Sequence, residues 1–524
     1  MQRLLTGLRK NRTVLITMVV LLALFLLAIQ GLSTQDWVIT LLRGLSLSAI
    51  IFLVTAGFSL IFGLMDVMNF AHGTLFMIGA YVGWSAYVRP DTVLDLLPPV
   101  ALLAAGLLLQ PLWNALLGRV RLPDLVARVW PWIGLLLAAA LVVGVLSSWP
   151  VSRWVPGNPT TGPGGDSVVM DQALETKQPR PEPASAGRGP VWALAGALLA
   201  GTVGAASLAG LARRRQAGEL RAARVSWRTW AVLGIVILGG IAVYLANDAL
   251  TAWFYRLDTT WTFMIALVVG LLVGAVLGGV MEVTLIRPLH TRPIYYLMVT
   301  LGLGVVGIEL VQVLWGRTEF TAPKPALFRG AGAACPATDL ASWLEYHCST
   351  ISVLGGRVRV YNEVFIILVG LVVFVAVTLL LQRTRLGMII RAGVQDSQMV
   401  EALGINVRRV FTLVFALGVA LAAFGGVVAG PSMGLSPAMG ESLLLLSLIA
   451  MAIGGLTSFP GAAVGSLLVG VLQQFIIKYG QVGIRLPFLA EPFKPTPPLV
   501  PASTVLLMVV ILLVLPQGLL GRKE

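Results

Sequence analysis

Long apolar runs separated by short polar segments dominate this chain. An apolar run of about 18 residues or more is long enough to cross a bilayer as a helix. Such runs lie at about 13–31, 39–62, 71–88, 97–117, 129–147, 190–211, 229–247, 261–285, 294–315, 362–382, 410–430 and 500–520. A longer run, 437–479, is interrupted by the glycine- and proline-containing stretch 454–461, so it predicts two shorter helices. The pattern therefore predicts an all-α, polytopic transmembrane helical bundle with about 14 membrane crossings, broken helices included.

The first strong interruption of this pattern is the stretch 63–73, which reads Gly-Leu-Met-Asp-Val-Met-Asn-Phe-Ala-His-Gly. Non-helical backbone at membrane depth is tolerated only where protein buries it or where it lines a water-filled cavity. Interrupted hydrophobic segments also indicate the binding site of a transporter. Asp66, Asn69, His72 and Gly73 are therefore candidate residues of a translocation path. The competing interpretation is that Asn69 and His72 only cap the helix ends.

Other polar residues inside apolar runs raise the same question. Ser458 and Pro460, in the second break, are further candidates for the path. Charge near the bilayer centre is costly, so Glu282 and Glu309 must face protein or water. Glu282 lies five residues before Arg287, which predicts a structural ion pair near the cytoplasmic end of the helix. Glu309 lies nearer the middle of its run and either lines the cavity or bonds to a neighbouring helix.

The composition agrees with a membrane protein. Of the 524 residues, 57% are hydrophobic and 11% are charged, and the mean hydropathy is +0.89. Soluble domains carry about 25% charged residues. The basic N-terminus is not followed by a small-residue cleavage pattern, so 13–31 is expected to stay as an anchor helix.

The distribution of charge predicts the orientation. If the N-terminus is cytoplasmic, the cytoplasmic segments hold 22 Lys and Arg against five acids, which is the bias of the positive-inside rule. These segments are 1–12, 118–128, 212–228, 286–293, 383–409 and 521–524. The net charge of +14 is thus spread over several short loops, which argues against a nucleic-acid-binding patch. This topology puts the break at 63–73 on the cytoplasmic side.

Two exterior segments are long. Residues 148–189 are rich in proline and glycine and predict a mobile loop. Residues 316–361 have a mixed composition that suits a small ordered cap, and they contain both cysteines, Cys335 and Cys348. In an oxidising compartment the two thiols would close a disulfide, and otherwise they are unrelated free thiols. Two cysteines and three histidines in the whole chain predict no metal site.

The longest charged cytoplasmic segment, 383–409, contains a short amphipathic pattern. Residues 396–403 predict a helix with Met399, Val400 and Leu403 on one stripe, and Gly404 suits its C-terminal cap. Such a helix either lies on lipid or docks into a groove on a soluble partner. The candidate contacts to a partner are the polar residues of this segment and the residues at the end of the helix: Arg391, Asp396, Glu401, Ala402, Leu403, Gly404 and Asn406.

Five motifs in order carry a resemblance to a known family. The first is 63–73 followed by Met-Ile-Gly-Ala-Tyr at 77–81. The others are Glu282 with 287–289, 384–392 with 402–406, 454–455 with 460–461, and Leu-Pro-Gln-Gly-Leu-Leu-Gly at 515–521. Together they resemble the branched-chain amino acid ABC transporter permeases of the LivH type.

The resemblance implies a domain organisation. It covers 39–90 and 261–524, which form the permease core, and leaves 1–38 as an N-terminal anchor. It does not cover 91–260, an insertion of four apolar runs that contains the proline- and glycine-rich exterior loop. An even number of added helices returns the chain to the same side of the membrane, so the topology of the core survives the insertion.

The resemblance also implies a function: a transport protein, not an enzyme, that moves branched-chain or other apolar amino acids into the cytoplasm across a bacterial cytoplasmic membrane. The expected partners are a second, homologous permease subunit, two cytoplasmic ATPase subunits, an extracytoplasmic substrate-binding protein and membrane lipid. The chain has no Gly-x-x-x-x-Gly-Lys-Ser/Thr motif, so we expect it to bind no cofactor and its partners to hydrolyse the ATP. In the family, the 396–406 segment couples to the ATPase. The alternatives are a urea or short-amide permease of the same type, and a stand-alone secondary transporter.

Overall fold

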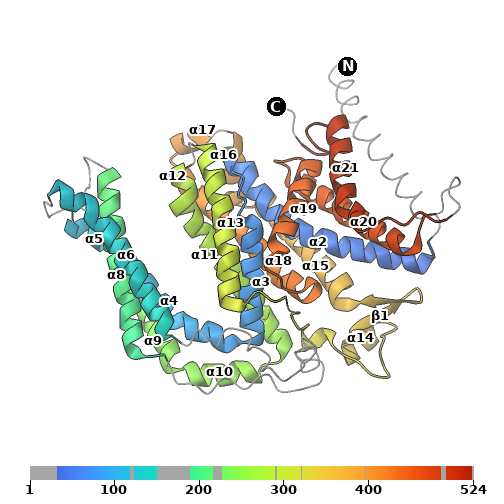
Figure 1. Cartoon of the computed structure of the whole chain (residues 1–524), viewed down its shortest axis with the longest axis horizontal. Coiled ribbons are helices and arrows are strands. Elements are labelled where there is room, and N and C mark those ends of the chain that lie inside the picture. The colour runs from blue at the N-terminus through green and yellow to red at the C-terminus, as the bar shows by residue number, and fades with distance from the viewer. Residues whose placement is uncertain are drawn as a thin grey trace, which may run out of the picture. The chain divides into compact units, whose positions relative to one another are not determined.

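The structure is a computed structural model that describes residues 32–117, 123–149, 189–215, 227–289, 292–319, 321–395, 397–484 and 491–521. The predictions for 13–31, for most of the loop 148–189 and for Asp396 lie outside these residues. The described chain is helical apart from turns and one small hairpin, so the predicted all-α class is confirmed (Figure 1).

The chain divides into two compact units, which are described separately. Unit 1 comprises Met1–Trp84, Phe263–Val313 and Arg317–Glu524. Its main helices are α2 (Thr34–Met65), most of α3 (His72–Val88), α11 (Thr259–Met281), α13 (Pro293–Trp315), α15 (Ile366–Arg383), α16 (Arg385–Gln395), α17 (Ser397–Ala402), α18 (Val407–Met433), α19 (Met439–Gly454), α20 (Phe459–Val482) and α21 (Leu499–Val514).

Unit 2 comprises Ser85–Thr262 and Leu314–Gly316, where the sequence predicted an insertion at 91–260. Its helices are α4 (Pro90–Leu108), α5 (Gln110–Leu117), α6 (Asp124–Ser148), α8 (Val191–Arg215), α9 (Trp227–Leu245) and α10 (Asn247–Arg256). Helix α4 contacts α8, α9 and α10. Asp95 of α4 accepts a hydrogen bond from Asn247, and Asp91 accepts one from Tyr255, so paired polar groups hold α10 against α4.

The apolar runs predicted from 39–62 onward lie on helices, except that 500–520 is helical only to Val514 and that 97–117 is divided between α4 and α5. Among the described residues, nine helices are long and apolar enough to cross a membrane, or ten if the bent pair α9–α10 counts as one span. Helices α19 and α21 are apolar but shorter, with 16 residues each. The chain is therefore a multi-pass membrane protein, while the expected number of about 14 crossings stays a prediction.

Small residues set the close packing of unit 1. Helix α2 meets α18 where Gly57 faces Gly418: a Cβ atom on Gly57 would lie 2.1 Å from the Gly418 carbonyl oxygen. Helix α2 meets α20 at Gly470, where a Cβ would lie 2.5 Å from the Ser48 nitrogen. Close approach through small residues is a common way for helices to associate in membranes, where apolar burial against lipid gives little driving force.

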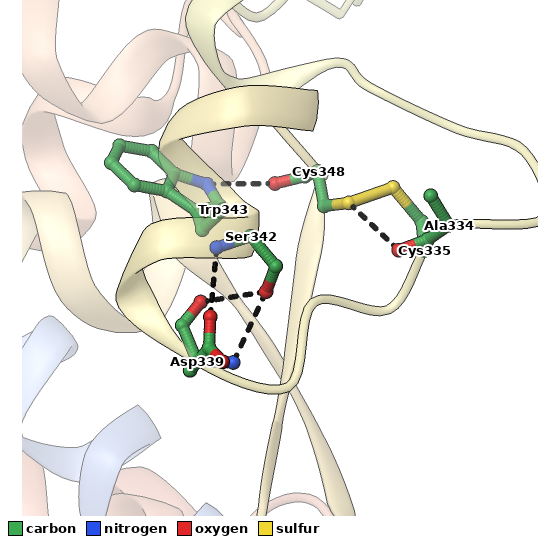
Figure 2. The surroundings of a disulfide bond; sticks show 6 residues. All are labelled: Ala334, Cys335, Asp339, Ser342, Trp343 and Cys348. Atoms are coloured by element: carbon green, nitrogen blue, oxygen red, sulfur yellow. Dashed lines mark hydrogen bonds between the residues drawn. A yellow bond between two sulfur atoms is a disulfide. The ribbon is translucent and has the colours of Figure 1, made fainter.

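The segment between α13 and α15, which the charge pattern predicts to be exterior, folds into a small cap. It contains α14 (Leu340–Tyr346) and a hairpin of β1 (Thr350–Val353) and β2 (Gly356–Arg359). The structure joins Cys335 to Cys348 by a disulfide across a sequence separation of 13 residues (Figure 2). Cys348 is fully buried, and its carbonyl accepts a hydrogen bond from the Trp343 indole N–H at 3.0 Å.

Helix α14 begins with a capping box next to this disulfide. The Ser342 amide donates to the Asp339 carboxylate at 2.7 Å, and the Ser342 hydroxyl accepts from the Asp339 amide (Figure 2). The backbone hydrogen bond from Ser342 holds the pKa of Asp339 below its usual range. The sequence predicted an ordered cap but not its helix and hairpin.

The motif at 515–521 closes the second break. Helix α19 ends at Gly454, and the amides of Leu519 and Leu520 donate to the carbonyls of Ile453 and Gly454, each at 2.9 Å. Gly455 and Gly518, both with positive φ, allow the two turns to touch. Two stretches separated by about sixty residues in the sequence thus satisfy each other's backbone at the end of α19.

Candidate functional site

The first break is a turn followed by an extended segment. Asp66 adopts a left-handed conformation (φ 52°) and its amide donates to the Phe62 carbonyl, which ends α2. The chain then runs back along α2 to His72, whose Nε2 lies 3.1 Å from the carbonyl oxygen of Val54. Helix α3 therefore starts beside the middle of α2.

Helix α13 follows this returning segment in parallel and in register (Figure 1). The Tyr296 hydroxyl donates to the Asp66 carbonyl, the Phe70 amide to the Thr300 hydroxyl, and the Thr74 hydroxyl to the Gly304 carbonyl, at 3.2, 3.3 and 3.3 Å. At 1.5 Å rise per residue, the level of Thr300 is about 10 Å and that of Gly304 about 16 Å from the start of α13.

This register refines the expected position of the break. The charge pattern put the whole of 63–73 on the cytoplasmic side, where α13 begins. Only the end at Asp66 lies at that level, while His72 and Gly73 lie two to three helical turns deeper. Hydropathy shows that a span is interrupted, but it does not show that the chain doubles back inside the bundle.

The start of α3 meets the start of α19. A Cβ atom on Gly73 would lie 2.2 Å from the Gly440 carbonyl oxygen, and one on Gly440 would lie 2.4 Å from that of Gly73. The amides of a first helical turn lack intrahelical partners and carry partial positive charge. Two such helix ends converge here at the depth of the break.

A groove of about 280 Å³ opens beside these helix ends, between α3, α13 and α19. Its walls are mostly apolar. The lining residues are Phe70, Thr74, Leu301, Gly304, Val305, Glu441, Leu444, Leu445 and Leu448. Glu441 is the charged residue among them, and it belongs to the first turn of α19.

The polar candidates of the first break face away from this groove. The Asn69 side chain is 1% exposed, accepts a hydrogen bond from the Ala71 amide at 3.0 Å, and lies 3.9 Å from the Met281 sulfur. His72 is fully buried and packs edge-on against Phe58, with ring centroids 5.4 Å apart. Asp66 is exposed at the end of α2. Asn69 has capping geometry, and His72 is held by the Val54 carbonyl.

The other candidates of the path are dispersed. Ser458 is the N-cap of α20 and accepts from the Gly461 amide at 3.1 Å, and Pro460 is exposed in the first turn of that helix. Glu309 is exposed on α13, one helical turn beyond Val305, and does not line the groove. Of the predicted path residues, Gly73 is therefore the one placed directly at the converging helix ends.

The Glu282 and Arg287 side chains meet in a two-pronged contact. Arg287 Nε lies 3.1 Å from Glu282 Oε1, and Nη2 lies 2.8 Å from Oε2. The intervening turn, Glu282–Ile286, is a π-helix, and its wider turn aligns residues five apart. The Thr412 hydroxyl of α18 donates to the same carboxylate at 2.8 Å. The Glu282 side chain is 2% exposed and that of Arg287 is 37% exposed.

Replacing Arg287 by methionine is expected to lower the free energy of unfolding by about 3 kcal/mol, because the change leaves a buried carboxylate without its cation. The partial exposure of Arg287 puts the effect at the low end of the range for buried pairs. Thermal unfolding of the purified protein in detergent measures it. Arg383→Met, at an exposed arginine at the end of α15, is the control and should change stability by less than about 0.5 kcal/mol. Equal stability of the two variants would contradict the prediction.

The segment 383–409 forms two short helices, α16 and α17, before α18 begins. Helix α17 ends at Ala402, and the amides of Gly404 and Ile405 donate to the carbonyls of Glu401 and Val400. With φ at +81°, Gly404 completes a Schellman cap. Asn406 caps α18 by accepting from the Arg409 amide at 3.2 Å.

The predicted apolar stripe of this segment is divided. Met399 is 59% exposed and Leu403 is 73% exposed, whereas Val400 is buried at 3% and packs into the protein. Arg391, Glu401, Ala402, Gly404 and Asn406 are exposed. The described segment thus presents two apolar side chains surrounded by polar ones.

None of the nine residues that line the groove was among the predicted site residues; three of them, Phe70, Thr74 and Glu441, lie near a motif or carry a signal in the sequence. Phe70 lies inside the motif 63–73 and Thr74 directly follows it, but the predicted path residues of this motif were Asp66, Asn69, His72 and Gly73. Glu441 had a usable signal, because it is a lone acid within the long run 437–479, as Glu282 and Glu309 are within theirs.

Similarity to known proteins agrees with this architecture. The family model described as branched-chain amino acid transport system / permease component matches residues 40–170 and 225–515. The permease LivH of Escherichia coli K12 is 27% identical over 271 residues, which cover 51% of this chain and 78% of LivH. The permease BraD of Pseudomonas aeruginosa is 32% identical over 174 residues, covering 33% of this chain and 52% of BraD.

A relative with a different printed substrate is also similar. The fructose import permease FruF of Bifidobacterium longum is 23% identical over 254 residues, covering 47% of this chain and 61% of FruF. No solved structure gives a significant match. The family match covers most of the chain on both sides of the 171–224 gap, and the relatives are transport permeases, not enzymes. This chain belongs to the permease components of branched-chain amino acid transport systems.

Proposed function

We propose that this chain is a membrane subunit of an ATP-binding-cassette importer that carries branched-chain amino acids into the cytoplasm of a bacterium. The observation that carries the proposal is the family match over 40–170 and 225–515, together with relatives named for branched-chain amino acid transport. The work of import comes from partner subunits, because the sequence contains no phosphate-binding loop for ATP.

The proposed partners follow from the same family. They are a second, homologous permease, two cytoplasmic ATPase subunits and an extracytoplasmic binding protein. The two permeases span the cytoplasmic membrane, and the other subunits bind to them from either side. The surface around Met399 and Leu403 supports the ATPase contact, since exposed apolar side chains on a rigid, capped helix suit a groove on a soluble partner. Arg391, Asp396 and Glu401 would supply the polar rim.

In this proposal, ATP binding and hydrolysis bias the bundle between inward- and outward-open states. Each ligand does work only through its different affinity for the two states. The converging starts of α3 and α19 lie on the translocation path, with Gly73 at their contact. Asn69 and His72 stabilise the backbone of the break, because Asn69 accepts a hydrogen bond from the Ala71 amide and His72 is hydrogen-bonded to the Val54 carbonyl.

Uptake of labelled substrates tests the proposal. The chain is expressed with its partner subunits in a bacterium that lacks its own branched-chain amino acid importers. We expect saturable uptake of leucine that vanadate, an inhibitor of such ATPases, abolishes. Uptake of urea or fructose in place of leucine would assign another substrate. Leucine uptake that resists vanadate and collapses with the proton gradient would instead identify a secondary transporter.

A further inference from the structure

The groove between α3, α13 and α19 combines three features that match the three parts of an amino acid. It has an apolar wall, one carboxylate, and two helix N-termini at one end. We propose that this groove binds the transported amino acid during passage, with the substrate ammonium on the Glu441 carboxylate and the aliphatic side chain against the leucines. The inference rests on the proposed function and names the binding site for its substrate.

The apolar wall suits a branched aliphatic side chain. Leu301 and Val305 contribute from α13, and Leu444, Leu445 and Leu448 from α19. Ligand pockets of proteins enclose about 300–1,000 Å³ and are mostly apolar with a few placed polar groups. At about 280 Å³ this groove lies just below that range, which suits a single small molecule.

Glu441 gives the groove its charge preference. A carboxylate on an apolar helix must face water or a polar partner, and Glu441 opens onto the groove. An acid in the first turn of a helix is also stabilised by the helix dipole, which explains why α19 tolerates it. The dipole would stabilise an acid at any position of that turn. Glu441 occupies the position that faces α3 and α13, where its carboxylate can contact a ligand in the groove.

The converging helix ends favour the opposite charge. Gly73 and Gly440 bring the first turns of α3 and α19 into backbone contact beside the groove. Amides of first helical turns bind carboxylates, and this use is known at the broken helices of transporters in general. In this proposal the substrate carboxylate lies toward the first turns of α3 and α19. The amides of His72 and Met439 and the Thr74 hydroxyl are already donated, to the carbonyls of Asn69, Ser436 and Gly304.

This arrangement separates substrates by charge. Leucine, isoleucine and valine carry the ammonium that Glu441 requires. Urea and fructose carry none, so the Glu441 carboxylate offers them no ionic contact.

A thiol placed in the groove reports occupancy without relying on transport. Cys335 and Cys348, the two cysteines of the sequence, are joined in a disulfide, so Leu445→Cys introduces a single reactive thiol. Leu445 is 56% exposed and lines the groove. The rate of its modification by a small maleimide is measured in the assembled transporter in membrane vesicles, with and without ligand.

Leucine and leucinol, which both carry the ammonium, are expected to slow the labelling at least threefold. 4-Methylpentanoate, which has the same side chain and no ammonium, should leave the rate unchanged. In the Glu441→Gln background the protection by leucine should disappear, and Glu441→Asp should restore part of it. Equal labelling rates of the two backgrounds without ligand show that the groove is intact.

Protection by 4-methylpentanoate as strong as that by leucine would overturn the assignment of Glu441. So would leucine protection that survives in Glu441→Gln. The substrate panel needs no change at Glu441, so the proposal stays testable even if that variant does not fold. Uptake measurements distinguish failure of the proposed binding site from failure of the proposed function. Normal leucine uptake by Glu441→Gln would reject only the binding site in the groove. A wild-type complex that imports no leucine would reject the proposed function.

Discussion

Leucine uptake should fall about tenfold or more when Leu403 is replaced by aspartate. Leu403 is 73% exposed at the end of α17, where the Schellman cap formed by Gly404 fixes its direction. In the proposed function this apolar side chain packs into a groove on the ATPase subunit, and burying a carboxylate in its place costs several kcal/mol. The permease should still fold, because Leu403 does not belong to the buried core.

Leu403→Met is the matched variant, since it keeps an apolar contact of similar size and should retain most of the uptake. Co-purification of the ATPase subunits provides the second measurement, and Leu403→Asp should weaken it in parallel with uptake. Full uptake by a stably expressed Leu403→Asp protein would show that α17 is not the ATPase contact and would favour an interfacial helix on lipid.

Gly73→Ala should destabilise the protein by about 2–3 kcal/mol, because it forces extra volume between two packed backbones. The new Cβ would lie 2.2 Å from the Gly440 carbonyl oxygen and 2.8 Å from the Leu444 Cβ. Neither neighbour is the end of a flexible side chain, so α3 and α19 must separate. That separation displaces the wall of the groove, and leucine uptake should be lost together with thermal stability.

Gly302→Ala is the control for this prediction. Gly302 is also in a membrane-spanning helix, but a Cβ added there meets nothing within 4 Å. Alanine has the higher helix propensity, so this variant should be neutral or slightly more stable. Thermal unfolding and uptake are measured on both variants, and an unaffected Gly73→Ala would mean that the two helix starts do not make the close contact.

The helices could be predicted because the membrane imposes one rule along the whole chain. Wherever an apolar run was long enough, its backbone had to bond within a helix, so the runs 39–62 and 410–430 lie in α2 and α18. The cap between α13 and α15 was harder to predict, because α14 and its hairpin depend on local capping and turn residues such as Asp339 and Gly355.

The candidate site was predictable in part. The motif at 63–73 lies beside the groove, but none of its candidate residues Asp66, Asn69, His72 and Gly73 is among the lining residues. Asn69 and His72 bond to backbone, and the lining comes from Phe70 and Thr74 together with residues more than two hundred positions away. Such a surface depends on the register of α3, α13 and α19, and a single sequence contains no measure of that register.

The contact of Glu282, Arg287 and Thr412 has a mechanical meaning. Thr412 lies in the second turn of α18, directly after the capped loop that ends at Asn406. Arg287 lies in the short connection that leads into α13, the helix carrying Leu301 and Val305. The three side chains join the beginning of α18 to the segment that precedes α13. A displacement of the loop before α18 can therefore be transmitted through this contact toward α13, which carries part of the wall of the groove.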